Sequence, residues 1–540
     1  MPLFSRRTRR VLGPVGALAA ISLLAACSGG GGSDTTEGDG GDLASARDTL
    51  IFAIKEDPTC IDPQQTTLTT SLNIGRQVVD SLVDQDSESG EIVPWLASEF
   101  SSSDDLTSFT FTLQDGVTFS DGTPLTSDVV KANFDSLFAL GRTASLASQY
   151  LAGYTATEVE DESTFTVTFS APNVQFLQGA STMTLGLVSE ETTALSAEER
   201  CTTGVVGSGP FVYDSYTPND SVVITAREGY GWPSELREHT GDALVSTIEF
   251  PVITENGNRT GGLESGEYDI IQDVPYIDAA RFGSDDYSLF SKANTGVPNG
   301  LIPNTTRSAI LADDAVRQAI LIGTDREEIN DLTGAPDAAA ASSSLTSSTT
   351  GFVDQGDALA YDPDAAEELL DDAGWEMGSD GVREKDGQKL TFTVTAFYAQ
   401  DVLEVAQMQL AKIGVDMQIN LTDAGGFFGA IASGEYDMLA AGLTRTDPDA
   451  LRTVFAQASA SKWAIIDDAE LESVLAEQAT LSDVDARLEL IDQAQALITE
   501  NADFVPLLET VQLHGASSAI EGFEFDSASR IVLYDVRATS

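Results

Sequence analysis

LESGEYDI at residues 263–270 recurs as IASGEYDM at residues 431–438, and the letters SGEYD are identical in the two copies. Each copy follows a stretch with helical spacing, contains a glycine that favours a helix end, and leads into an apolar run typical of a buried strand. Two equivalent helix-to-strand units so far apart predict two α/β lobes of related topology. A chance match of a common turn is the alternative explanation of the repeat.

The segments between the two copies alternate between strand and helix patterns. Residues 390–396 and 415–421 read as strands, and residues 402–413 between them have helical spacing. A strand–helix–strand order implies neighbouring parallel strands in one sheet. The Ala-, Ser- and Thr-rich residues 335–351 are expected to form a long surface loop.

The N-terminal residues 1–26 have the pattern of an export signal. Arginines at positions 6, 7, 9 and 10 precede an apolar run, and LAA at 24–26 stands directly before Cys27. The run is too short for a dedicated membrane span, and small residues before a cysteine are typical of a lipoprotein signal. We therefore expect a lipid on Cys27 to anchor the protein on the outer face of the cell membrane, with residues 27–47 as a flexible tether. An ordinary signal peptide is the alternative, and the choice between Sec and twin-arginine export stays open.

Composition restricts what the chain can bind. The 86 acidic residues against 28 basic ones give a formal net charge of −58, which repels phosphate backbones, so no nucleic-acid partner is expected. If Cys27 carries a lipid, Cys60 and Cys201 are left as an even pair outside the cytoplasm, and we expect a disulfide between them. The two histidines, His239 and His514, stand far apart in the sequence, so neither a metal centre nor another cofactor is expected.

The sequence contains no recognisable catalytic motif. A Gly-x-Ser-x-Gly elbow, a His-Glu-x-x-His pair and a complete phosphate-binding loop are all missing. Acidic residues between 84 and 91 resemble a calcium loop, but their glycine and closing glutamate stand at the wrong offsets, so a hairpin turn is expected. The pattern favours a binding protein over an enzyme. An extracytoplasmic hydrolase of peptides or cell-wall fragments is the alternative from a different class.

Several segments, in the right order between about residues 48 and 530, resemble a known family. The matching segments are PWLA at 94–97, DGVTFSDGTPLT at 115–126, VKANF at 130–134, GSGPF at 207–211, YDP at 361–363 and DFVPL at 503–507. They are similar to the extracellular solute-binding proteins of ABC importers, in the dipeptide, oligopeptide and nickel class called family 5. The block from 94 to 134 resembles the family signature almost position by position.

The resemblance implies an α/β, two-lobed periplasmic-binding-protein-like fold of the type II, or cluster C, class. It places the sheet domain of lobe I at 48–75, 197–295 and 505–540, an extra inserted subdomain at 76–196, and lobe II at 296–504. A ligand would bind in the cleft, and closure would present both lobes to a membrane permease. The implied protein is a monomer without enzymatic activity that delivers small peptides to an ABC permease, with a nickel chelate or an oligosaccharide as the alternative cargo.

In peptide-binding relatives, an aspartate near an Asp-Pro pair after a Gly-Trp strand end receives the ligand amine. The matching stretch, GLTRTDPD at 442–449, is shorter and has leucine in place of the tryptophan. Asp447 best matches the amine-binding position, with the cap of the following turn as its alternative, and alanine there is expected to weaken binding tenfold or more, about 1.4 kcal/mol. Arg445 would bind a ligand carboxylate if it faced the cleft, and a surface position is its alternative. Thr69 and Thr70 match a cleft loop of the relatives.

Overall fold

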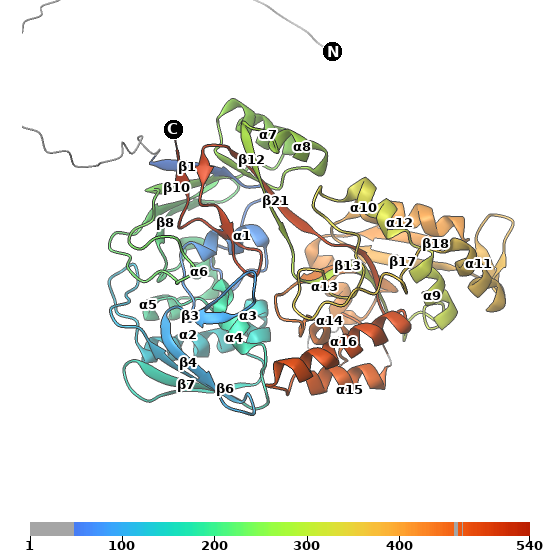
Figure 1. Cartoon of the computed structure of the whole chain (residues 1–540), viewed down its shortest axis with the longest axis horizontal. Helices are drawn as coiled ribbons and strands as arrows, with labels where there is room; N and C mark the ends of the chain where they lie inside the picture. Colours follow the sequence, from blue (N-terminus) through green and yellow to red (C-terminus); the bar gives the residue numbers. More distant parts are fainter. Residues whose placement is uncertain (1–47, 458–462, 467, 540) are drawn as a thin grey trace, which may run out of the picture. The chain divides into compact units, whose positions relative to one another are not determined.

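The computed structural model describes residues 48–539 except 458–462 and 467. The predicted export signal at 1–26, the lipidation site Cys27 and the tether at 27–47 lie outside the described residues. The described part belongs to one unit of the chain, and it contains three larger sheets with their helices (Figure 1). Among its helices, none is long and apolar enough to span a bilayer.

The largest sheet has seven strands that come from three separate parts of the chain. In order across the sheet they are β12 Tyr287–Ala293, β21 Val511–Ser517, β11 Ile270–Gln272, β1 Thr49–Ala53, β10 Thr247–Pro251, β9 Ser221–Ala226 and β8 Phe211–Thr217. β1 is parallel to both of its neighbours, while the outer pairs are antiparallel. Along these strands, buried residues such as Phe52, Ile248 and Phe250 alternate with more exposed ones, which gives the sheet a buried apolar face. The helices around it are α1 Thr69–Arg76, α6 Ala197–Thr203, α7 Asn256–Ser265 and α8 Ala279–Phe282.

The chain between β1 and β8 of the large sheet forms a separate four-stranded antiparallel sheet. Its strands, in order, are β4 Ala97–Ser102, β5 Ser108–Leu113, β7 Thr164–Phe169 and β6 Tyr154–Val159. The accompanying helices are α2 Ser127–Leu140, α3 Ser145–Tyr150, α4 Phe176–Ser181 and α5 Glu190–Thr193. Phe109 of β5 and Phe169 of β7 both pack on Phe176 of α4. The ring centres of Phe109 and Phe169 are 5.8 Å apart, and each lies 4.9 Å from the ring centre of Phe176. We call this region the inserted subdomain, and the seven-stranded sheet with it lobe I.

A five-stranded sheet is the centre of lobe II. Its strands, in order, are β18 Asp416–Leu421, β17 Thr391–Ala396, β19 Met438–Thr444, β13 Gly296–Pro303 and β20 Val505–Leu508. β17 is parallel to β18 and α12 Gln400–Lys412 connects them, so the predicted strand–helix–strand unit is confirmed. The other helices are α9 Asp314–Ile322, α10 Arg326–Thr333, α11 Pro363–Asp372, α13 Ala424–Ser433, α14 Ala450–Phe455, α15 Ala469–Gln478 and α16 Val484–Glu500.

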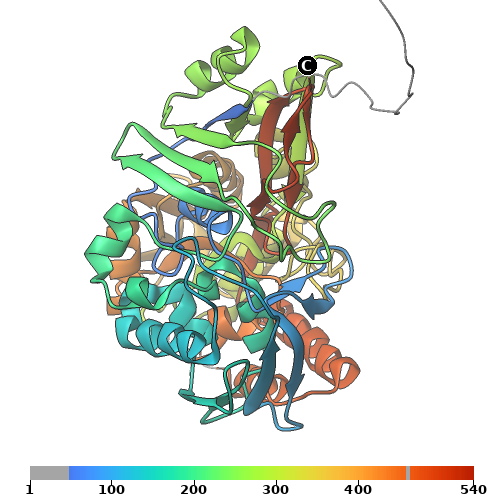
Figure 2. The same ribbon diagram turned by 90° about the vertical axis from the view of Figure 1, so that its left-hand side faces the viewer.

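The chain passes between the two large sheets twice, from β12 to β13 and from β20 to β21. β20 pairs with β13 in lobe II, so the sheet of lobe I resumes at Val511 rather than at the predicted boundary, residue 505. β12 and β21 are neighbours along their whole length (Figure 2). Asn294 and Thr510 join the two passages, with the Asn294 N–H 2.9 Å from the Thr510 carbonyl oxygen.

Smaller two- and three-stranded sheets complete the described chain. They are β2 Val83–Gln85 with β3 Ile92–Pro94, β14 Glu376–Met377 with β15 Arg383–Lys385 and β16 Gln388–Lys389, β22 Ile520–Glu521 with β25 Arg537–Ala538, and β23 Glu524–Phe525 with β24 Ile531–Val532. The hairpin turn predicted in place of a calcium loop is confirmed, because Asp86 accepts hydrogen bonds from the backbone N–H groups of Glu88 and Ser89.

The two SGEYD copies have the same local structure. α7 and α13 end at Gly266 and Gly434, whose φ angles of +73° and +68° lie in the left-handed region that glycine adopts without strain. Asp269 and Asp437 each accept a backbone N–H from the neighbouring parallel strand, at 2.9 Å from β1 and 3.1 Å from β17. The repeat is therefore one helix-to-strand unit used once in each lobe.

One expectation about lobe II is wrong in part. Residues 335–351 form no helix or strand, as predicted, but only part of this loop lies on the surface. Ser343, Leu345 and Thr346 are buried, and Ser343 donates a hydrogen bond of 2.9 Å to Gln495 of α16. Small polar residues can be buried without cost when their hydroxyl groups find partners, and low-complexity composition does not distinguish this from solvent exposure.

Candidate functional site

Arg445 follows the end of β19 and joins lobe II to the inserted subdomain. Its side chain is buried, with 2% of the residue exposed. It donates hydrogen bonds to the side-chain oxygens of Gln175, at 2.9 Å, and Gln149. Its Cζ lies 4.6 Å from the ring centre of Tyr150, a cation–π distance. Arg445 thus lies between the lobes, and the surface position considered for it is wrong.

The neighbouring residue makes a second contact between the lobes. Thr446 donates a hydrogen bond of 3.0 Å to the carbonyl oxygen of Ser527. Ser527 lies in the turn between β23 and β24 of lobe I, and its hydroxyl donates to Gln85 over 3.0 Å. This turn also contains Arg530, which the sequence analysis did not single out.

Arg530 lies beside one of the predicted threonines. It donates a hydrogen bond of 3.0 Å to the Thr69 hydroxyl, and among the described residues no carboxylate lies within 4.0 Å of its nitrogens. Burial lowers the pKa of Arg530, an effect opposed chiefly by the charge of Asp526. Arg445 and Arg530 therefore lie on opposite lobes, on segments joined by the hydrogen bond from Thr446 to Ser527.

Thr70 faces a different set of partners. It is buried, and its hydroxyl oxygen lies 3.2 Å from a Glu56 carboxylate oxygen and 3.0 Å from the Gln272 amide nitrogen. Glu56 follows β1 and Gln272 ends β11, so Thr70 lies at the carboxyl edge of the parallel part of the large sheet. Ligands of open α/β sheets bind at this edge.

Asp447 is engaged within lobe II. Its two oxygens accept hydrogen bonds from Arg487 of α16, at 2.5 and 3.1 Å, and one of them also accepts the Asp449 N–H at 2.7 Å. Burial by itself would raise the pKa of Asp447, but the charge and hydrogen bonds of Arg487 outweigh burial and lower it. A carboxylate has about four acceptor positions, so most of this one are used before any ligand binds.

A buried side-chain amide in α4 has no hydrogen-bond partner within the described chain. Gln178 of α4 is 4% exposed, and neither its side-chain nitrogen nor its oxygen forms a hydrogen bond within the described chain. It lies one helical turn after Gln175, the residue that binds Arg445. An unsatisfied buried amide costs roughly 1–3 kcal/mol, so a polar group supplied from outside the chain would be stabilised here.

Comparison with known proteins identifies the family. The family model of bacterial extracellular solute-binding proteins, family 5, matches residues 91–464. The chain belongs to this family. The glutathione-binding protein GsiB of Salmonella typhimurium is 24% identical to this family 5 protein over 502 residues, which cover 89% of this chain and 92% of GsiB.

Solved structures match the whole fold of this family 5 protein. NikA from Brucella suis in complex with Fe(III)-EDTA superposes with a TM-score of 0.78 at 22% identity, over 91% of this chain and 99% of NikA. A dipeptide-binding protein from Pseudoalteromonas sp. SM9913 in complex with Met-Leu gives a TM-score of 0.76 at 21% identity, over 91% of this chain and all of the other. The two-lobed periplasmic-binding-protein fold predicted from the sequence is confirmed.

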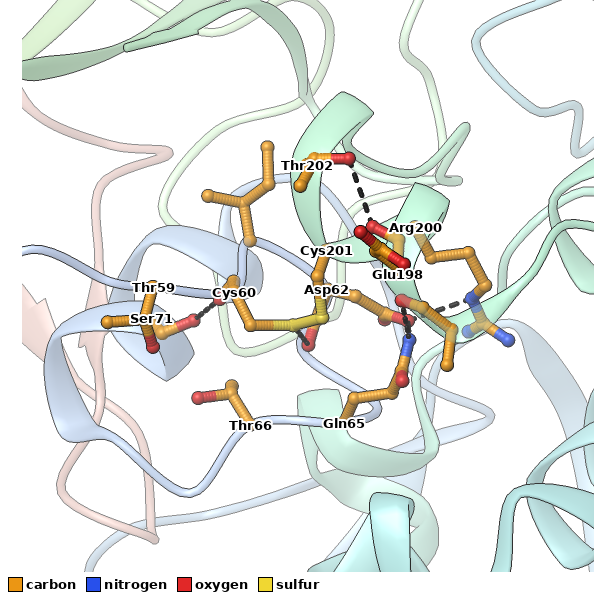
Figure 3. The surroundings of a disulfide bond; sticks show 12 residues. Thr59, Cys60, Asp62, Gln65, Thr66, Ser71, Glu198, Arg200, Cys201 and Thr202 are labelled. Atoms are coloured by element: carbon orange, nitrogen blue, oxygen red, sulfur yellow. Dashed lines mark hydrogen bonds and ion pairs between the residues drawn. A yellow bond between two sulfur atoms is a disulfide. The ribbon is translucent and has the colours of Figure 1, made fainter. Parts of the chain in front are cut away.

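The predicted disulfide of the family 5 protein is present. Cys60 and Cys201 are bonded, with their Cα atoms 4.2 Å apart, and the bond closes a loop of 141 residues (Figure 3). Beside it, Arg200 and Asp62 form a fully buried ion pair at 2.8 Å, and the Ser71 hydroxyl donates to the Cys60 carbonyl. These contacts fix the loop that leads into α1, the helix that begins with Thr69.

The histidines lie apart in the family 5 fold. His239 contacts Asp535 at 2.5 Å and stacks on Tyr534 at 4.1 Å between ring centres. His514 is buried among phenylalanine rings, and burial lowers its pKa to about 4. Within the described residues, no three His, Cys, Asp or Glu side chains are grouped so as to hold a metal ion.

Proposed function

We propose that this protein is the membrane-tethered receptor of an ABC importer, which binds a small peptide-like solute between its lobes and delivers it to the permease. The observation that supports this most directly is Arg445. This buried guanidinium joins the two lobes through hydrogen bonds to neutral amide oxygens, and no carboxylate of the described chain lies within ion-pair distance of it, so it can pair with a ligand carboxylate. Membership of a solute-binding family supports the same function.

The proposed ligand class is small peptides, with glutathione included. One relative is a glutathione-binding protein, and one structural neighbour contains the dipeptide Met-Leu. The proposed binding residues are Arg445, Thr69, Thr70 and Asp447. At Asp447 a ligand amine would compete with Arg487 for the carboxylate oxygens.

Binding without turnover is the test of this function. Titration calorimetry of the full chain with glutathione, Met-Leu, a nickel–histidine chelate and a maltooligosaccharide should give saturable binding of a peptide-like solute at one site. Mass spectrometry should recover that solute unchanged. Saturable binding of the chelate or the sugar alone would replace the ligand class, and catalytic conversion of a peptide would contradict a receptor role.

Tethering has its own test. The LAA-Cys pattern at 24–27 supports a lipid on Cys27. Replacing Cys27 with serine should move the protein from the membrane fraction to the soluble fraction of the producing cells, whereas the control Ser28→Ala should not. A Cys27→Ser protein that stays in the membrane fraction would contradict the proposed anchor.

A further inference from the structure

Arginines without an acidic partner form two groups in this structure. Among the arginines whose side chains are described, Arg227, Arg259 and Arg326 donate instead to three or more backbone carbonyl groups each. We call these the bracing arginines. Arg445 and Arg530, the junction arginines, form no hydrogen bond to a backbone carbonyl.

The junction arginines lie on the two segments through which the lobes meet. Arg445 packs on the ring of Tyr150 from lobe II, and Arg530 lies on lobe I in the turn between β23 and β24, three residues after Ser527. The hydrogen bond from Thr446 to Ser527 ties the two segments together. Two positive charges thus lie on adjoining segments of the two lobes, in a chain whose formal net charge is −58.

The neutral partners of these arginines leave most of their donors unused. A guanidinium has five N–H donors in a planar fork, and its matching acceptor is a carboxylate. Within the described chain, Arg530 donates one hydrogen bond, to a hydroxyl, and Arg445 donates two, to amide oxygens. Each arginine therefore has N–H donors available for one carboxylate. The unpartnered amide of Gln178 is a further donor beside Gln175.

The same region offers little to a cation. The carboxylate oxygens of Asp447 already accept hydrogen bonds from Arg487 and from a backbone N–H. Asp526 lies 3.9 Å from Arg76 and accepts two backbone N–H groups of its own turn. Asp447 and Asp526 are thus already engaged by protein groups, and Glu56 accepts the Thr70 hydroxyl, whereas neither junction arginine has a carboxylate within 4.0 Å in the described part of the chain.

We infer that the cargo is a small solute with two carboxylates, one bound by Arg445 and the other by Arg530. This inference rests on the proposed function and narrows its ligand class to acidic peptides and similar dicarboxylates. Neutral dipeptides with a free amine are then poor ligands, because their single carboxylate can pair with only one of the two guanidinium groups.

The test compares matched probes by titration calorimetry on the full chain. Glutathione and the dipeptide Glu-Glu carry at least two carboxylates, while glutathione diethyl ester and Met-Leu carry none and one. We expect the acidic probes to bind at least tenfold more tightly than both others. Equal binding of Met-Leu would overturn the inference and leave the proposed function standing. Binding of none of the four would overturn both.

Variants assign the effect to the two arginines. Arg530→Gln and Arg445→Gln should each weaken glutathione binding at least tenfold and reduce the discrimination against the diester, and Arg530→Lys should recover part of it. The control Arg537→Gln removes a half-exposed arginine paired with Glu521 and should change neither quantity. Circular dichroism verifies that each variant is folded. Unaltered discrimination in folded Arg530→Gln would overturn the inference.

Discussion

The bracing arginines and the junction arginines differ in the groups that accept their hydrogen bonds. Arg326 donates to four backbone carbonyls at 2.8 to 3.0 Å, all of them fixed parts of the folded chain. Arg530 has a single hydroxyl partner, and Arg445 has two side-chain amide partners. The bracing arginines have all their hydrogen-bond partners in the folded chain, so they support folding. The junction arginines gain their remaining partners from a ligand, so they determine binding.

The largest effect is expected for a bracing arginine. Arg326→Gln leaves buried carbonyls without donors and should lower the free energy of unfolding by about 3–5 kcal/mol, measured by urea denaturation. Arg530→Gln should lower it by less than about 1 kcal/mol, since it removes one hydrogen bond. If the two substitutions lower the free energy of unfolding by the same amount, the distinction between the two groups of arginines fails.

The disulfide sharpens the comparison on the lobe I side. The Cys60→Ser, Cys201→Ser double variant should lose about 2–5 kcal/mol of stability, because the bond restricts a long loop in the unfolded chain. Ligand affinity should fall as well, since the loop before Thr69 is less well fixed. Matched measurements on oxidised and reduced wild type provide the control, and equal stability of the two forms would contradict a structural role.

Asp447 separates a structural ion pair from a ligand contact. Asp447→Asn leaves the Arg487 charge partly buried and uncompensated, and should cost about 2 kcal/mol of stability. Denaturation and calorimetry on the same variant measure stability and affinity together. A tenfold loss of affinity with unchanged stability would instead establish Asp447 as the amine-binding residue of the peptide-binding relatives.

Local patterns could be predicted from the sequence, and long-range partners could not. Gly266 and Gly434 end helices because their own backbone conformation requires it, so the SGEYD repeat predicted one unit in each lobe. Arg445 and Asp447 look equivalent in a short motif. Their roles differ because Arg487, 40 residues later, binds the carboxylate, while the hydrogen-bond partners of the guanidinium within the described residues belong to the inserted subdomain.

Arg530 was missed because no motif surrounds it. The only signal available was scarcity, since 28 basic residues must serve a chain with 86 acidic ones. A basic residue in such a chain normally has an acidic neighbour. Which arginine lacks one depends on the packing of the turn between β23 and β24 against α1, and no local pattern encodes that packing.

The smallest expected effect concerns an acid beside an arginine whose donors are already used. Asp503 is buried 3.9 Å from Arg317, which donates to the carbonyls of Leu311 and Asn501, and burial raises the pKa of Asp503 to about 7. A raised pKa stabilises the fold at low pH, and this contribution is lost as pH rises through 7. Between pH 6 and 7.5, wild type should lose about 1 kcal/mol relative to Asp503→Asn.

Thermal or urea unfolding of the two proteins at both pH values measures that difference. Comparing them cancels the contributions of other titrating groups, His514 among them, whose lowered pKa acts in the opposite direction. A difference between the two proteins that is independent of pH would mean that Asp503 is ionised in the folded chain.

Native mass spectrometry of the full chain purified with its own cargo tests the central claim most directly. The account predicts one bound solute per chain, identified by fragmentation as a small molecule with two carboxylates, and its loss from the Arg530→Gln protein prepared in the same way. A neutral or cationic solute that stays bound to the Arg530→Gln protein would contradict it.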